Sequence, residues 1–257
     1  QLTLETGASD AVVNYSSGSG SDTLTFNYTV AASQNSADLQ YNSTSPLSLN
    51  GGTITDSATN AANTSLPAIA SANSLAGSKA IVIDTAGPTI SSASSSPASP
   101  SFSQTPTISL TSSEAATVTL YSDSGCTQAI SSATSVSSGA GQQVTTSTLN
   151  ANQSTTIYAK GVDTVGNTGS CTASLLVYTH DNVAPTASSF VRAGTATANT
   201  LPVNFTVTFS ENMSAASFTA ADVSNTGTAT GVTWSVTQVN STTFTVGATG
   251  SGNGTLI

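Results

Sequence analysis

The chain repeats itself with a period of 97 residues (181 − 84), and this period constrains its fold more than any other feature. The pattern Asp-x-x-x-Pro occurs from Asp84 to Pro88 and again from Asp181 to Pro185. Both Asp to Asp (181 − 84) and Pro to Pro (185 − 88) are therefore 97 residues apart. A fixed period of this kind is the sequence signature of tandem structural modules.

A second pair of landmarks keeps the same period. Ser113-Glu114 recurs as Ser210-Glu211, again 97 residues later (210 − 113). This period equals the length of one immunoglobulin-like β-sandwich, which has about 100 residues. Because Pro stiffens the backbone and removes a hydrogen-bond donor, the Asp-x-x-x-Pro segments are expected to be the junctions between modules. The predicted domains are residues 1–84, 85–181 and 182–257.

The composition favours strands over helices. Only 6% of the residues are charged, and Lys and Arg together number three, so residues that favour surface helices are scarce. The abundant Thr and Val favour strands, whereas Ser, Gly and Asn favour turns. Because 37% of the residues are hydrophobic, the chain has enough apolar side chains to form folded cores. The composition therefore predicts an all-β protein.

Short segments in which apolar and polar residues alternate recur along the whole chain. Each is bounded by Gly, Ser, Asn or Pro, which is typical of half-buried strands between turns. The predicted strands are Asp22 to Val30, Thr105 to Leu110, Ala116 to Tyr121, Thr155 to Val162, Leu201 to Phe209 and Thr242 to Val246.

Several of these segments resemble immunoglobulin-like repeats of very large bacterial surface adhesins. The sequences LTLETG, SSGSGSDTLTFNYTV, LNGGTITDSATN and IVIDTAGP in residues 1–88 look like one repeat type, and VAPT with FTVTFSENMSAASFTAADV in residues 183–257 looks like a second. The middle domain is similar in layout. The resemblance implies tandem immunoglobulin-like β-sandwich domains in an extended array, with both terminal domains truncated. Alternatively, neighbouring subunits supply the missing strands, as in donor-strand fibres.

Acidic residues are predicted to gather at the junctions. In a seven-strand sandwich the B–C and F–G loops lie beside the linker from the preceding domain, so Asp84, Glu114 and Asp163 should converge there, with Asn167 as a further metal-site residue. Carboxylates about 4 Å apart repel by roughly 4 kcal/mol at an effective dielectric constant of 20. Ca²⁺, which accepts six to eight oxygen ligands, would relieve this repulsion. The resemblance also implies calcium, because linkers of this kind often bind it.

The second junction is predicted to place Asp181 beside Glu211. This site is expected to be incomplete, because its F–G loop would follow residue 257. The alternative for both junctions is that Asp and Asn cap turns in these loops without a metal.

The only two cysteines, Cys126 and Cys171, both lie in the middle domain. An even number of cysteines in a chain of extracellular composition predicts a disulfide. The alternative is a pair of buried free thiols.

Nothing in the sequence indicates catalysis. The one histidine, His180, is interpreted as a surface linker residue, and no nucleophile, zinc-protease or phosphate-loop motif occurs. A net charge of −9 with three cations does not suit nucleic acid, and no run of about 18 apolar residues predicts membrane insertion in this segment.

The sequence therefore predicts a non-catalytic stalk or spacer of an extracellular bacterial surface adhesin, rigidified by calcium at its junctions. Its expected partners are neighbouring domains or subunits of the same protein, and a cell-surface or glycan receptor is expected to bind through regions outside this chain. One alternative is a subunit of a self-assembling extracellular filament. Another is a carbohydrate-binding accessory module, which requires two or three exposed aromatic residues aligned on one sheet face, and the sequence shows no such set.

Overall fold

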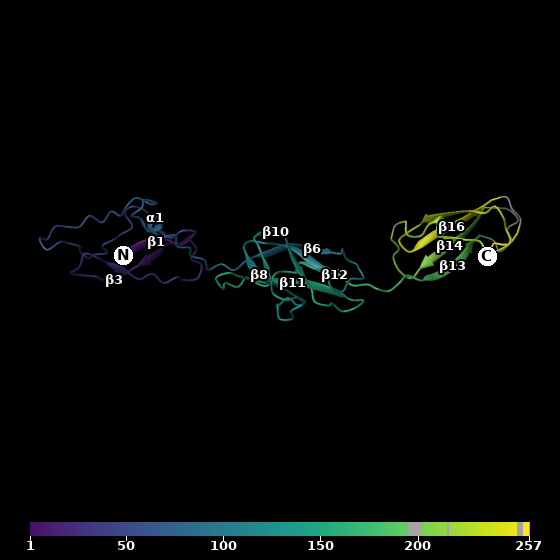
Figure 1. The fold of residues 1–257 in the computed structure, drawn as a ribbon, viewed down its shortest axis with the longest axis horizontal. Helices are drawn as coiled ribbons and strands as arrows, with labels where there is room; N and C mark the ends of the chain where they lie inside the picture. The colour runs from purple at the N-terminus through teal and green to yellow at the C-terminus, as the bar shows by residue number, and fades with distance from the viewer. Residues whose placement is uncertain (195–201, 215, 251–253, 257) are drawn as a thin grey trace. The chain divides into compact units, whose positions relative to one another are not determined.

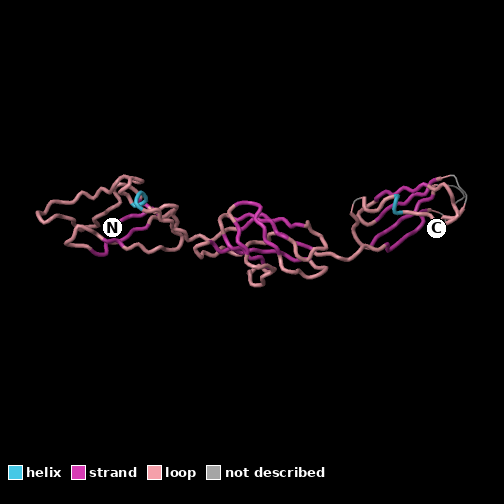
Figure 2. Tube along the Cα trace, in the orientation of Figure 1, coloured by secondary structure: helices cyan, strands magenta, loops and turns pink. Residues whose placement is uncertain are grey.

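The computed structural model describes residues 1–194, 202–214, 216–250 and 254–256 (Figure 1). As the composition predicts, the fold is all-β, and Figure 2 shows strands and loops nearly everywhere. The exceptions within these ranges are the short helix α1 (Leu75–Ser78) and the 3-10 turn η1 (Ala220–Asp222). Among the described residues, no helix is long and apolar enough to cross a membrane.

The chain divides into two compact units, Gln1–Asp181 and Asn182–Ile257. The first unit contains two separate hydrophobic clusters. One cluster draws on residues between Leu4 and Ile83, and the other on residues between Ile90 and Tyr178.

The first 84 residues contain short strands. A three-stranded sheet has the order β2-β1-β5, and a two-stranded sheet pairs β3 with β4. The strands are β1 (Leu2–Glu5), β2 (Ala11–Val13), β3 (Tyr15–Ser17), β4 (Thr25–Phe26) and β5 (Gln40–Tyr41).

The strand predicted from Asp22 to Val30 is wrong over most of its length, because only Thr25–Phe26 forms β4. The alternating pattern of this segment is matched by burial only in part. Phe26 and Tyr28 are partly buried against the core, whereas Leu24 and Val30 are 37% and 46% exposed. Because the core does not cover both ends of the segment, its apolar alternation does not hold a long strand.

Residues 85–181 form two antiparallel sheets, with the orders β10-β7-β6 and β12-β11-β8-β9. The predicted strands Thr105 to Leu110, Ala116 to Tyr121 and Thr155 to Val162 fall on β7, β8 and β11. The bounds are β6 (Ile90–Ser96), β7 (Thr107–Ser112), β8 (Ala116–Tyr121), β9 (Thr134–Val136), β10 (Gly139–Thr145), β11 (Ser154–Asp163) and β12 (Leu176–Thr179).

One hydrophobic cluster joins these two sheets. In β7, in β8 and in β11 from Ile157 onward, every second residue is buried, as alternation of side chains across a strand requires. Ile108 of β7, Val118 of β8 and Ile157 of β11 are all 0% exposed and belong to this cluster. Side chains from both sheets therefore share one core.

The described residues of the second unit form a four-stranded sheet, in the order β13-β14-β16-β15. The predicted strands Leu201 to Phe209 and Thr242 to Val246 fall on β14 and β16, although Leu201 itself lies outside the described residues. The bounds are β13 (Ala187–Ala193), β14 (Val203–Phe209), β15 (Thr233–Gln238) and β16 (Thr243–Thr249).

The 97-residue repeat is visible in the hydrogen bonds of both units. In the first unit, Thr89 N donates to Ser113 Oγ (2.9 Å) and Ser113 N donates to Thr89 O (3.0 Å). In the second unit, Thr186 N donates to Ser210 Oγ (3.0 Å) and Ser210 N donates to Thr186 O (2.9 Å). Each Thr precedes the first strand of its sheet, and each Ser follows the second. The sequence period thus corresponds to a repeated local structure.

His180 is buried, so its interpretation as a surface linker residue is wrong. Its side chain is only 1% exposed. Its Nδ1 accepts a hydrogen bond from the backbone N–H of Asn152 (2.8 Å), which leaves Nε2 to donate to the carbonyl of Phe102 (3.1 Å). Both ring nitrogens therefore satisfy backbone groups, and the ring holds the end of β12 against two loops.

Candidate metal site

Three acidic residues from distant parts of the sequence converge. Asp84 precedes β6, Glu114 lies in the turn between β7 and β8, and Asp163 is the last residue of β11. One carboxylate oxygen from each lies within 4.8 Å of the other two. Asp163 is buried, and Asp84 and Glu114 are half-buried. We call these three residues the acidic cluster.

Hydrogen bonds fix Asp163 at the start of the turn that follows β11. Its Oδ1 accepts from the backbone N–H groups of Val165 (2.9 Å), Gly166 (2.7 Å) and Asn167 (2.8 Å). Gly166 has φ of +99°, a conformation that favours glycine. Asp163 thus caps the turn, as the metal-free alternative expects, and it also presents its carboxylate to the cluster.

Asn167 supports the acidic cluster through its amide nitrogen. Its Nδ2 donates to Asp163 Oδ2 (2.7 Å) and to the backbone carbonyl of Asp84 (3.1 Å). In this arrangement Asn167 links two of the three segments that carry the carboxylates, those of Asp84 and Asp163. Its own oxygen could reach a cation in the cluster only if the amide gave up these two hydrogen bonds.

Glycines allow the linker at Gly87 and Pro88 to lie directly against β11 and the segment that follows it. A Cβ atom on Gly169 would lie 2.0 Å from the carbonyl oxygen of Pro88, and one on Gly87 would lie 2.4 Å from Gly169 N. A Cβ atom on Gly161 would lie 2.9 Å from Cγ of Pro88. No Cβ atom fits at these three glycines unless a neighbour moves, so the linker that carries Asp84 is held close to β11 and its turn.

The three carboxyl groups differ in how their surroundings affect protonation. Burial raises the pKa of Glu114, and the nearby charges of Asp84 and Asp163 raise it further. Burial also acts to raise the pKa of Asp163, but hydrogen bonds from Asn167, Val165 and Gly166 outweigh it and leave that pKa below its ordinary value. Asp163 is therefore the more readily ionised of the two, and Glu114 is the more readily protonated.

The two residues predicted for the second junction belong to different units. Asp181 closes the first unit, where its backbone N–H donates to Ser101 O (2.9 Å). Glu211 lies in the second unit, where its Oε1 is buried and has no hydrogen-bond partner among the described residues. The metal site predicted from them stays a prediction.

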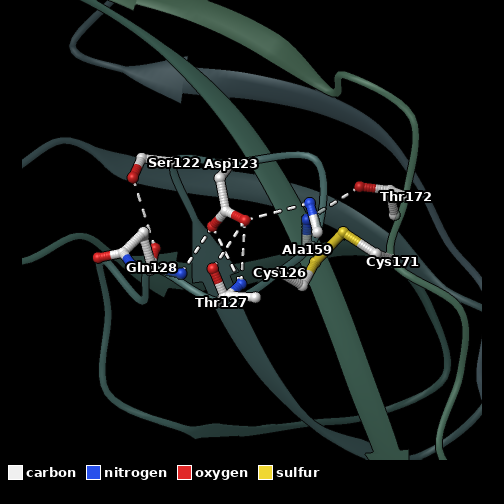
Figure 3. Close-up of a disulfide and its surroundings, with 9 residues drawn as sticks. Ser122, Asp123, Cys126, Thr127, Gln128, Ala159, Cys171 and Thr172 are labelled. Atoms are coloured by element: carbon white, nitrogen blue, oxygen red, sulfur yellow. Dashed lines mark hydrogen bonds between the residues drawn. A yellow bond between two sulfur atoms is a disulfide. The ribbon is translucent and has the colours of Figure 1, made fainter.

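Cys126 and Cys171 form a disulfide, which is the predicted pairing (Figure 3). Cys126 lies in the loop from Ser122 to Gln128, and Cys171 lies shortly after the turn capped by Asp163. The bond therefore ties the loop after β8 to the segment after β11.

Asp123 organises the loop that contains Cys126, and the sequence interpretation did not single it out. Its carboxylate accepts hydrogen bonds from the backbone N–H groups of Gly125 (3.1 Å), Thr127 (3.0 Å) and Gln128 (2.6 Å), as Figure 3 shows in part. Hydrogen bonds lower the pKa of Asp123, and the one from the backbone N–H of Gln128 has the largest effect. The sequence Asp-Ser-Gly was the available signal, because Asp before Gly is typical of such turns.

The chain has no significant match among protein-family models, curated proteins or solved structures. Its function is therefore argued from the chemistry of its own residues.

Proposed function

We propose that the chain is a non-catalytic structural stalk or spacer of an extracellular bacterial surface adhesin, built from tandem immunoglobulin-like β-sandwich domains. We further propose that Asp84, Glu114 and Asp163 bind one Ca²⁺ ion that stiffens the junction after residue 84. The observation that carries the metal proposal is the convergence of three carboxylate oxygens within 4.8 Å. The disulfide supports an extracellular location, because disulfides persist in oxidising compartments.

The chemistry of the cluster favours calcium over other metals. Three carboxylates at this separation repel one another, and a divalent cation offsets that repulsion. All the donor atoms are oxygens, whereas zinc sites are built mainly from Cys and His. Ca²⁺ tolerates irregular geometry and accepts backbone carbonyls and water as further ligands.

Calcium would reinforce a linker that is already bound at several points. On one side, Thr85 N–H donates to Asn35 Oδ1 (2.8 Å) in the first 84 residues. On the other side, Asn167 Nδ2 donates to the carbonyl of Asp84 (3.1 Å). A metal bound by Asp84, Glu114 and Asp163 would add a third connection between the linker and the two loops. Its role would be mechanical, because a stiff junction transmits the position of one module to the next.

Substituting Glu114→Gln is expected to weaken calcium binding about tenfold or more, because affinity depends on the number of charged ligands. The wild-type dissociation constant is expected to be on the order of 0.1–1 mM, as in extracellular calcium modules. Isothermal titration calorimetry on chelator-treated protein measures both values. Glu5→Gln is the matched control, since it removes the same charge from an exposed site in the first 84 residues. Equal losses of calcium affinity in Glu114→Gln and Glu5→Gln would show that calcium does not bind at the acidic cluster.

Calcium affinity is expected to fall as the pH falls through the raised pKa of Glu114. Ca²⁺ binds the ionised carboxylate, so a protonated Glu114 must release its proton first. The lowered pKa of Asp163 keeps that group ionised over the same range. Calorimetry from about pH 7 down to about pH 4, in buffers of different ionisation enthalpy, measures the affinity and the protons released. An unchanged proton release in Glu114→Gln would contradict this assignment.

A further inference from the structure

Two tyrosines lie side by side on the solvent face of the sheet β12-β11-β8-β9. Tyr158 of β11 is directly opposite Tyr121 of β8 in the strand register. Both tyrosines are half-buried residues, whereas their neighbours Ala159 and Leu120 point into the core and are 0% exposed. Tyr121 and Tyr158 are 37 residues apart (158 − 121), so only the strand register brings them together.

A lysine completes this surface. Lys160 lies two residues after Tyr158 on the same face of β11, opposite Thr119, and its Nζ is 5.9 Å from the centre of the Tyr121 ring. The ring attracts the ammonium group and so limits the positions it samples. Lys160 is the one Lys or Arg between residues 85 and 181. It forms no salt bridge with any residue that the structure describes. We call Tyr121, Tyr158 and Lys160 the tyrosine–lysine face.

The chemistry of the face matches a sugar that carries a carboxylate. The face of an aromatic ring has a partial negative charge, which attracts the C–H groups on one side of a pyranose ring. The Lys160 ammonium can pair with a carboxylate, and the hydroxyl groups of Thr119 and Thr156 on the same face can bond to sugar hydroxyls. Strands β8 and β11 pair without a register shift from Tyr121 to Ala116, so this surface is regular enough for an extended chain of sugars.

We infer that the tyrosine–lysine face binds an acidic glycan, such as a uronic acid oligosaccharide. A neutral glycan would leave the Lys160 ammonium without a charged partner. This inference goes beyond the proposed stalk and does not depend on calcium.

The test is a calorimetric titration of the full chain with tetragalacturonate, and with a neutral galactose tetrasaccharide for comparison. The chelator EDTA is present throughout, because uronates bind calcium themselves and the outcome must not depend on the acidic cluster. Wild-type protein is expected to bind the uronate with millimolar affinity, at least about fivefold more tightly than the neutral sugar. Equal affinity for the two sugars, or no uronate binding at millimolar concentration, would overturn the inference.

Two variants assign the binding to its residues. Tyr158→Ala is expected to lower uronate affinity about tenfold by removing the stacking ring, and Lys160→Gln is expected to remove the preference for the uronate over the neutral sugar. The matched controls, Tyr15→Ala and Lys79→Gln, change the same residue types in the first 84 residues and are expected to bind like wild type. If Tyr158→Ala does not fold, Lys160→Gln decides alone. Wild-type preference for the uronate in Lys160→Gln would overturn the assignment.

Discussion

The double substitution Cys126→Ala, Cys171→Ala is expected to lower the free energy of unfolding of residues 85–181 by about 4 kcal/mol. The two cysteines are 45 residues apart in sequence, and the disulfide removes the conformational entropy of a loop of that size from the unfolded chain. For a module of about 100 residues this loss corresponds to a fall in melting temperature of roughly 15–30 °C.

Differential scanning calorimetry, with and without a reducing agent, measures this effect. Reduction of the wild-type protein should reproduce the double variant, whereas the same treatment should leave the double variant unchanged. If the oxidised wild-type protein and the double variant melted at the same temperature, the disulfide would contribute nothing to stability.

Gly169→Ala is expected to separate the linker from the loops that carry the acidic cluster. Its Cβ atom would lie 2.0 Å from the carbonyl oxygen of Pro88, so one of the two backbone segments must move. Overpacking of this kind costs on the order of 1–3 kcal/mol. Because Asp84 lies on the same linker, we expect the affinity for calcium to fall about tenfold or more as the third carboxylate leaves the cluster.

Thermal melting and calcium titration of this variant measure the two effects separately. Ser170→Ala, at the exposed neighbouring position, is the matched control and should behave as wild type in both measurements. Wild-type calcium affinity in Gly169→Ala would mean that close packing of the linker is not needed to form the site.

Much of the architecture could be predicted, because it depends on patterns that are local or periodic in the sequence. The composition predicts the all-β fold, and the alternation from Ala116 to Tyr121 coincides with strand β8. The period relates Ser113 to Ser210, and the structure gives both the same pair of hydrogen bonds. These features need no knowledge of tertiary contacts.

Other features depend on contacts between distant segments, and the sequence did not reveal them. His180 was interpreted as a surface residue, because nothing next to it shows that Asn152 and Phe102 surround its ring. Tyr121 and Tyr158 become neighbours only through the register of two strands. The alternation near Leu24 predicts a long strand, but no core covers that side chain.

The candidate metal site could be predicted from the sequence only in part. The convergence of Asp84, Glu114 and Asp163 was expected from the order of strands in the predicted sandwich, and the structure brings the three together. The orientation of the Asn167 amide is set by two hydrogen bonds across the linker, and no sequence pattern specifies it.

The contact between Gly87 and Gly169 has a consequence for how such proteins diversify. At this point main-chain atoms meet main-chain atoms, since no Cβ atom fits on either side. Both glycines lie within residues 85–181, so a gene recombination that replaced residues 1–84 would carry this main-chain contact along unchanged. The linker would keep its place against β11 whatever residues preceded it.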